Sequence, residues 1–259
     1  MKLKRIRYIN MDAYNAQGLL FDTDKFAFNV RFICNYLSKE IRKLNMIGDG
    51  TYKMISIRLR NTPSECKLVC SSDAKDVLSI GLQISESDQI KYKNMTNLIE
   101  RYEFYLHLLE EGYYYASEFV DIPLSALLDL NNKFRLNGYK NEWLWKKILI
   151  KEYNIHVSFK CYFTTFDFRL ELEVYDKRET VLLTNGVVFQ TGPDEIYYDK
   201  DFRKLVVCDN ELMIMDFLDK CSFKCNLDLL AKGVFNVEYS DYQKNRIRKF
   251  GQLIDSIKK

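Results

Sequence analysis

Histidine is the scarcest titratable residue of this chain, with only His107 and His156 among 259 residues. Proline and glycine are also few, at 3 and 10 residues, which leaves little material for long flexible linkers. No apolar run approaches the roughly 18 residues that cross a membrane, and no signal-peptide apolar core follows the basic start of the chain. We therefore expect a folded, cytoplasmic protein that makes no contact with a membrane.

Familiar catalytic motifs are missing as well. The chain contains no GxGxxG, GxxxxGK[ST], GxSxG or HExxH pattern. A nuclease-like carboxylate group near Pro193-Asp194 would need an acidic residue and a lysine two positions apart, but Asp199 and Lys200 are adjacent. Gly192-Pro193-Asp194 therefore predicts a turn. These absences favour a protein without catalytic activity and without a cofactor.

The 7 cysteines are an odd number, and several lie in apolar runs, which is typical of a reducing compartment. The spacings Cys66-x-x-x-Cys70 and Cys221-x-x-x-Cys225 formally allow a four-cysteine zinc site. Both lack the tight CxxC spacing of common zinc modules, so positions in the core are the favoured interpretation.

The net charge of +3, from 39 basic and 36 acidic residues, is too small to indicate a nucleic-acid partner by itself. Basic residues gather at both ends of the chain, at Lys2, Lys4, Arg5 and Arg7 and again at Lys244, Arg246, Arg248, Lys249, Lys258 and Lys259. If the two ends met, they would form a phosphate-binding surface, so nucleic acid is kept as an alternative partner.

What the chain does contain is alternation and helical periodicity in separate stretches. The first part predicts the order β-α-β-β-β, with strands near 3–9, 55–59, 66–70 and 78–84 and a helix from about Lys25 to Met46 that begins at Asp24. Three more helices are expected, from about Lys91 to Glu111 with Gly112 as the stop, from Pro123 to about Phe134, and from Asn141 through Leu149.

The C-terminal half predicts an antiparallel meander, with further strands near 181–189, 196–198, 205–208 and 212–214. A short helix at 227–231 follows, and an amphipathic helix from Ser240 carries Ile247, Phe250, Ile254 and Ile257 on one side. The predicted class is α+β, an antiparallel meander sheet with amphipathic helices packed on one face. We expect a single domain over 1–259, with 131–141 as the candidate for a subdomain boundary.

The clearest local prediction is a hairpin from Ile155 to Asp176, where two alternating runs flank Thr164-Thr165. A symmetric turn at these threonines makes the numbers of opposed residues add up to 329 and places Lys160 beside Arg169 and His156 beside Glu173 on the polar face. His156 with Glu173 is the one tempting acid–base pair, and a solvated cross-strand pair is its favoured interpretation.

Aromatic residues reach 14%, and exposed tyrosine is typical of protein-binding surfaces. The candidate partner-binding residues are Tyr113, Tyr114 and Tyr115, which cannot all face one core, and Lys160, Tyr162 and Arg169 on the hairpin. We therefore hypothesise a non-enzymatic protein that binds another protein, for instance as a bacterial immunity or antitoxin-like protein. The alternatives are an enzyme with an unfamiliar carboxylate-based site acting on nucleic acid, and a nucleic-acid-binding protein without catalysis.

Overall fold

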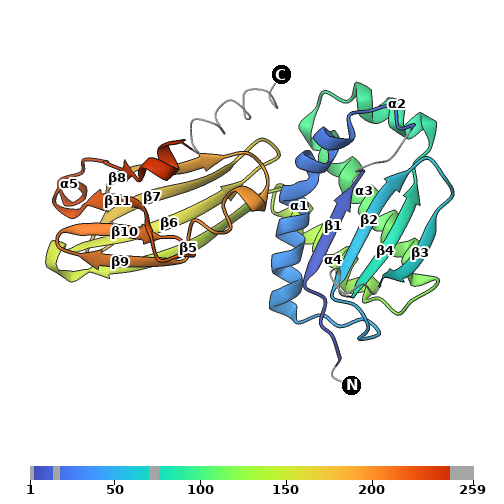
Figure 1. Ribbon diagram of the computed structural model, residues 1–259, viewed down its shortest axis with the longest axis horizontal. Coiled ribbons are helices and arrows are strands. Elements are labelled where there is room, and N and C mark those ends of the chain that lie inside the picture. Colours follow the sequence, from blue (N-terminus) through green and yellow to red (C-terminus); the bar gives the residue numbers. More distant parts are fainter. Residues whose placement is uncertain (1–2, 14–17, 70–75, 246–259) are drawn as a thin grey trace. The chain divides into compact units, whose positions relative to one another are not determined.

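A computed structural model describes residues 3–13, 18–69 and 76–245 (Figure 1). The chain divides into two compact units, Met1–Lys140 and Asn141–Lys259. Cys70 and the apolar residues Ile247, Phe250, Ile254 and Ile257 of the expected C-terminal helix lie outside the described residues.

The first unit is built on a mixed four-stranded sheet in the order β1-β2-β4-β3. Strands β1, β2 and β4 are parallel, and β3 pairs antiparallel with β4. The elements are β1 (Tyr8–Asp12), α1 (Thr23–Leu44), β2 (Met54–Arg60), β3 (Glu65–Val69), β4 (Val77–Gln83), α2 (Glu86–Asn94), α3 (Leu98–Ser117) and α4 (Leu124–Leu136). The predicted order β-α-β-β-β is confirmed.

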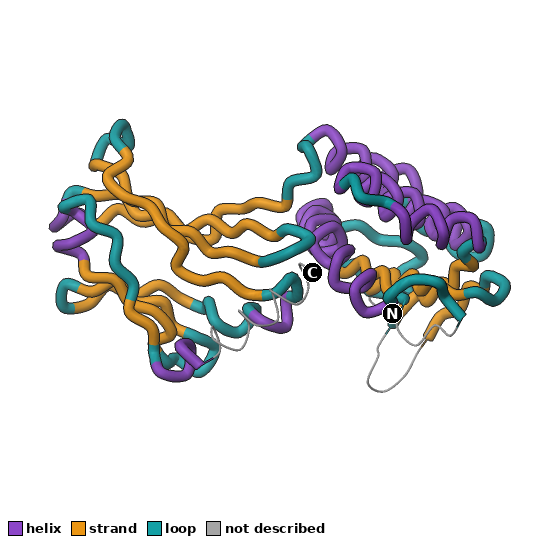
Figure 2. Tube along the Cα trace, turned by 90° about the horizontal axis from the view of Figure 1, so that it is seen from above, coloured by secondary structure: helices purple, strands orange, loops and turns teal. Residues whose placement is uncertain are grey.

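One face of this sheet is buried because the strands alternate. Ile55, Ile57 and Leu59 of β2 are buried, whereas Ser56, Arg58 and Arg60 between them remain at least partly accessible. Figure 2 shows helices gathered on one side of these strands. The period of two therefore buries the apolar residues under the helices and leaves the polar face of β2 outside.

Two helix ends differ from the prediction. Helix α1 is capped by Asp22, whose side chain accepts a hydrogen bond from the Lys25 amide, rather than by Asp24. Gly112 does not end a helix, because α3 continues to Ser117. A Cβ at Gly112 would come within 2.5 Å of Ile57 Cδ1, so glycine is required there by the close approach of α3 to β2.

The second unit contains two four-stranded antiparallel sheets, in the orders β5-β6-β7-β8 and β12-β11-β10-β9. Its elements are β5 (Asn141–Ile150), η1 (Lys151–Tyr153), β6 (Ile155–Phe163), β7 (Phe168–Asp176), β8 (Leu182–Thr191), η2 (Glu195–Tyr197), β9 (Lys204–Cys208), β10 (Glu211–Met215), β11 (Cys221–Asn226), α5 (Leu227–Ala231) and β12 (Glu238–Tyr239). The α+β class with antiparallel sheets in the C-terminal half is confirmed.

Aromatic rings fill the space between the two sheets. The rings of Phe189 on β8 and Phe223 on β11 lie 5.5 Å apart and join one sheet to the other. Tyr198 stacks on Phe168 with ring centroids 3.6 Å apart. Such contacts bury large apolar areas and stabilise the packing of the sheets.

Two predicted elements of the second unit are wrong. The segment from Asn141 to Ile150 is a strand rather than a helix, and it pairs with β6 along its whole length. The predicted strand at 196–198 is not formed; Ile196 and Tyr197 belong to the short 3₁₀ helix η2, in which the Ile196 amide donates a hydrogen bond to the side chain of Asp194.

The hairpin exists as predicted, but each residue of β6 lies opposite a residue of β7 that is two positions further along the chain than predicted. Phe163 lies opposite Phe168, so opposed residue numbers add up to 331 rather than 329. The reason lies in the four-residue loop 164–167, where the Thr164 hydroxyl accepts hydrogen bonds from the Phe166 and Asp167 amides. Because the shift is by an even number of residues, the apolar face is the predicted one.

Candidate partner-binding site

The structure brings Lys160, Tyr162 and Arg169 together on the outer face of β6 and β7. Tyr162 lies opposite Arg169, and the Arg169 guanidinium carbon is 5.6 Å from the centre of the Tyr162 ring. Lys160 lies opposite Glu171, so the predicted like-charge pair with Arg169 does not form. Each cation has an internal partner, because Lys160 Nζ is 2.7 Å from Glu173 Oε2 and Arg169 Nη1 is 3.2 Å from Glu171 Oε1.

The tempting pair of His156 and Glu173 does not form either. His156 lies opposite Tyr175, and its Nδ1 is 3.4 Å from Glu179 Oε1. Glu173 accepts hydrogen bonds from Lys160 and Tyr175 instead. The hydrogen bond to Glu173 raises the pKa of the Lys160 ammonium, since the neighbouring carboxylate favours the charged form. On this outer face of β6 and β7, the positive charges of Lys160 and Arg169 are therefore paired with the carboxylates of Glu173 and Glu171.

The three consecutive tyrosines on α3 point in different directions. Tyr113 is fully buried, and burial raises the pKa of its hydroxyl. Tyr114 is 53% exposed, and the ring of Tyr115 lies 5.1 Å from that of Phe119, which is itself exposed. A partner could therefore reach Tyr114 and the edge of the Tyr115–Phe119 pair, but it could not reach Tyr113.

The two cysteine spacings that suggested a metal site belong to different compact units. Cys66 lies on β3 in the first unit, while Cys221 and Cys225 lie on β11 in the second. Burial raises the pKa of the Cys225 thiol to about 12. Over the same residues, no group of three or more His, Cys, Asp or Glu side chains is arranged to hold a metal ion.

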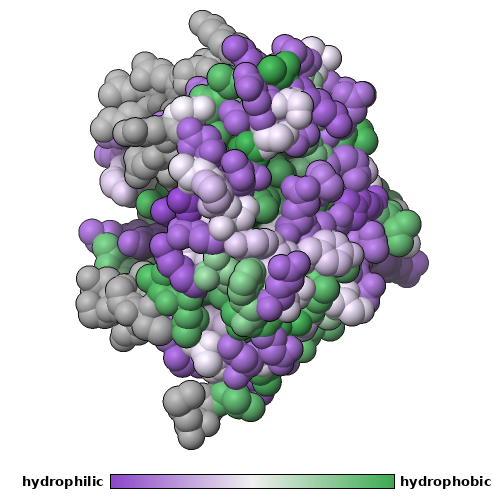
Figure 3. Space-filling model, turned by 90° about the vertical axis from the view of Figure 1, so that its right-hand side faces the viewer, coloured by the Kyte–Doolittle hydropathy of each residue, from purple (hydrophilic) through white to green (hydrophobic). Residues whose placement is uncertain are grey.

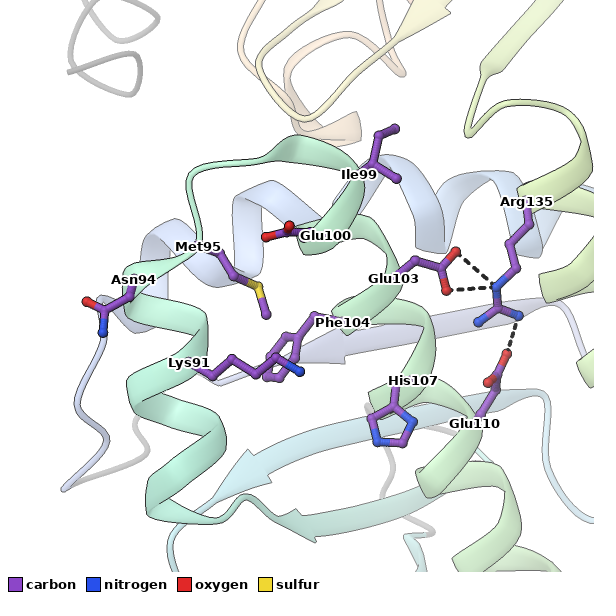
Figure 4. A pocket seen from close by; sticks show the side chains of 10 residues that line it. All are labelled: Lys91, Asn94, Met95, Ile99, Glu100, Glu103, Phe104, His107, Glu110 and Arg135. Carbon is purple, nitrogen blue, oxygen red and sulfur yellow. Dashed lines mark hydrogen bonds and ion pairs between the residues drawn. The ribbon is translucent and has the colours of Figure 1, made fainter.

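A cavity of about 810 Å³ lies in the first unit along α3, between α2 and the end of α4 (Figure 4). Arg135 forms one wall and is paired with both Glu103 and Glu110, at 3.0 and 2.6 Å. At the other end, Lys91 of α2 has no ion pair among the described residues, and His107 of α3 is 64% exposed. The ion pairs of Arg135 on α4 with Glu103 and Glu110 on α3 hold these two helices together.

The surface of the first unit drawn in Figure 3 mixes hydrophilic residues with small groups of hydrophobic ones. A different arrangement occurs in the second unit, at a hollow of about 680 Å³ between η2, the β10–β11 turn and the segment after β12. We call it the apolar hollow. Four large side chains that line it are mostly exposed: Ile196 at 77%, Phe217 at 61%, Leu218 at 66% and Tyr242 at 65%.

The base of the apolar hollow is polar and tightly bonded. Gln243, which is fully buried, donates hydrogen bonds to Asp201 Oδ1 at 3.0 Å and to Ser222 Oγ at 3.4 Å. This bonding fixes the segment that carries Tyr242 against the sheet. The apolar side chains around this base are more than half exposed.

Charged groups of both signs line the apolar hollow: the carboxylates of Asp201 and Asp216 and the ammonium groups of Lys200 and Lys220. Its two carboxylates have internal partners, since Asp201 is bonded to Gln243 and Asp216 accepts from the Leu218 and Lys220 amides. The ammonium groups of Lys200 and Lys220 form no ion pair with any described residue. The hollow thus offers exposed apolar anchors together with two ammonium groups that are in no ion pair with a described residue.

The four anchors were not predicted as site residues. Phe217 and Leu218 lie between Asp216 and Asp219 in the turn Asp216–Lys220. Two adjacent large apolar residues inside a charged turn are the sequence pattern that indicates an exposed binding residue here. Ile196 lies in η2 and Tyr242 near the end of the described chain, so only the fold brings them to the same place.

Comparison of the chain with family models, with curated proteins and with solved structures finds no match. Within the described ranges, the helices are all too short or too polar to span a membrane.

Proposed function

We propose that this protein binds another protein, and that its second unit does so by holding an apolar segment with acidic flanks in the apolar hollow. The observation that carries this proposal is the gathering of Ile196, Phe217, Leu218 and Tyr242 around one concave surface while each remains more than half exposed. Large apolar side chains that stand together in solvent are characteristic of interaction surfaces.

The ammonium groups of Lys200 and Lys220, which form no ion pair with a described residue, define the second feature of the partner. Carboxylates on the partner would form ion pairs with these two ammonium groups, which favours encounter and orientation more than affinity. Apolar contact with Phe217 and Leu218 would supply the binding energy, since aromatic and aliphatic anchors in a hollow dominate such interfaces.

A random-peptide display library is a suitable probe, because it requires no knowledge of the natural partner. We expect selection on the purified protein to enrich peptides in which a large apolar residue stands next to Asp or Glu. The double variant Phe217→Ala/Leu218→Ala should bind an enriched peptide about tenfold or more weakly, as expected for the loss of an anchor. Lys200→Gln/Lys220→Gln should weaken binding less and reduce its salt dependence.

Tyr162→Ala is the matched control, because it removes a partly exposed aromatic ring from the predicted surface on β6 and β7. If the enriched peptides bind Phe217→Ala/Leu218→Ala with wild-type affinity but bind Tyr162→Ala more weakly, the apolar hollow is not the binding site and the surface on β6 and β7 is supported instead. A failure to enrich any peptide would refute both. Should the natural partner prove to be a toxin, the protein would act as an immunity or antitoxin-like protein.

A further inference from the structure

Each sheet of the second unit ends in strands whose outer edges pair with no other described strand, and these edges differ in how they are protected. In one sheet, β5 carries a bulge between Leu144 and Lys146 with exposed lysines, and β8 shows two register shifts against β7. In the other sheet, β12 has only two residues. Bulges, charges and shortness are the devices that prevent edge strands from pairing with other chains.

Strand β9 lacks these devices. It pairs with β10 without any register shift, and its sequence from 204 to 208 is Lys-Leu-Val-Val-Cys, so its only charge is at its first residue. Val207 is 43% exposed, and Cys208 is exposed with a free thiol. This edge is therefore open to another strand.

The turn after β9 shows which backbone groups point outward. Asp209 and Asn210 both have positive φ, at 47° and 66°, which is the two-residue hairpin turn whose flanking residues, Cys208 and Glu211, bond each other. Since bonded pairs alternate along an antiparallel ladder, Lys204, Val206 and Cys208 bond β10. The N–H and C=O groups of Leu205 and Val207 consequently point away from the sheet.

We propose that β9 pairs antiparallel with β9 of a second copy of this chain, about a two-fold axis at Val206. In that register, Leu205 of each copy exchanges backbone hydrogen bonds with Val207 of the other, which makes about four bonds in all. The two Val206 side chains meet at the axis. Antiparallel pairing about an axis satisfies the same groups on both copies, as a two-fold interface requires.

The charges of the strand fit this register. Lys204 of one copy comes opposite Cys208 of the other, so the two lysines do not meet. The ammonium group of Lys204 lies 2.8 Å from Asp219 Oδ1 of its own copy, so its charge is already paired before a second strand approaches. A second copy is therefore the occupant that satisfies the outer backbone groups of this edge without bringing like charges together. Because one strand pair buries little area, the dimer should be weak and concentration-dependent.

A disulfide trap tests the register directly. At the axis, Val206 forms a pair that is not hydrogen-bonded, whose Cα atoms lie about 4.5 Å apart and within disulfide range. We expect Val206→Cys in a Cys208→Ser background to form a disulfide-linked dimer on mild oxidation. The native Cys208 is the internal control, because the two Cys208 residues would be offset by roughly 13 Å and should not link.

Sedimentation velocity over a concentration series tests the dimer without a trap. Wild type and Val206→Thr should associate as concentration rises, whereas Val206→Lys should stay monomeric because two ammonium groups would face each other at the axis. Val206 lies on the outer face of its sheet, so both variants should keep the wild-type circular dichroism spectrum. Equal linking by Cys208 alone, or a wild type that stays monomeric throughout, would overturn the proposal.

Discussion

Glu40 on α1 is a residue where burial and charge act against each other. Its carboxylate is mostly buried, and it bonds Lys133 Nζ at 2.5 Å and Lys43 Nζ at 2.6 Å. Burial alone would raise the pKa of Glu40, but the hydrogen bonds from the two ammonium groups outweigh burial and lower this pKa below its ordinary 4.5. The pair with Lys133 also ties α1 to α4.

A lowered carboxyl pKa gives stability a definite pH dependence. The contribution of Glu40 is complete above pH 4.5 and is lost as the pH falls through the lower, folded-state pKa. We expect Glu40→Gln to reduce the free energy of unfolding by about 1 kcal/mol at neutral pH and by less in acid. Urea unfolding of both proteins between neutral pH and about pH 3 measures the difference. A gap that widens in acid would contradict this assignment.

Gly112 is the second residue whose role follows from geometry. Alanine in a helix is favoured over glycine by up to about 1 kcal/mol. At this position, however, the added methyl would meet Ile57 Cδ1 at 2.5 Å and Cγ1 at 2.9 Å. We expect Gly112→Ala to destabilise the first unit by about 1–3 kcal/mol.

The relief variant for that prediction is Ile57→Val, which removes the Cδ1 atom. In the Ile57→Val background, Gly112→Ala should cost clearly less than in wild type, and a double-mutant cycle on thermal unfolding measures the coupling. Equal costs in the two backgrounds would show that the contact with Ile57 does not decide the effect.

At the scale of elements, the β6–β7 hairpin depends on one hydroxyl group. Thr164 Oγ1 accepts from the amides of Phe166 and Asp167, both at 3.1 Å, and donates to Asp167 Oδ1 at 2.7 Å. Thr164→Val keeps the shape and removes these bonds, so we expect a loss of about 1–2 kcal/mol in stability. Thr164→Ser keeps the hydroxyl and should stay close to wild type. Equal loss in both variants would mean that the methyl group, not the hydroxyl, matters.

The same loop shows why some elements follow from sequence and others do not. Strict alternation predicted β6 and β7 and their buried face, because that face depends only on parity. The exact register depended on side-chain bonds to the loop backbone, which alternation does not encode. In β5, the bulge at Leu144–Lys146 interrupts the alternation, and the resulting spacing imitates a helix. Pairing with β6 decides the strand.

The candidate site was less predictable than the fold, for a similar reason. Lys160, Tyr162 and Arg169 were expected together, because neighbours on one face of a hairpin follow from its period. The apolar hollow joins η2, the turn after β10 and the segment after β12, which are distant in sequence. Only tertiary packing shows that Ile196 and Tyr242 reach the same hollow as Phe217.

At the scale of the whole molecule, the boundary between the two compact units falls between Lys140 and Asn141 in the sequence. Each has its own buried aromatic cluster: Phe26 contacts Tyr92 and Tyr105 in the first, and Phe168 contacts Tyr198 and Phe202 in the second. The last residues of the first unit are held within it, because the Tyr139 hydroxyl bonds Glu103 and its ring contacts Tyr102. A cut after Lys140 therefore severs neither cluster.

We expect residues 1–140 and residues 141–259, made separately, each to fold and to unfold cooperatively, because a unit with its own core is stable alone. Circular dichroism should show helix mainly in the first fragment and strand in the second, and thermal melts should show one transition each. The second fragment should also bind the selected peptides with wild-type affinity, since every residue lining the apolar hollow lies within it. A fragment without a cooperative transition would instead support a single domain, in which the core of one unit requires the other.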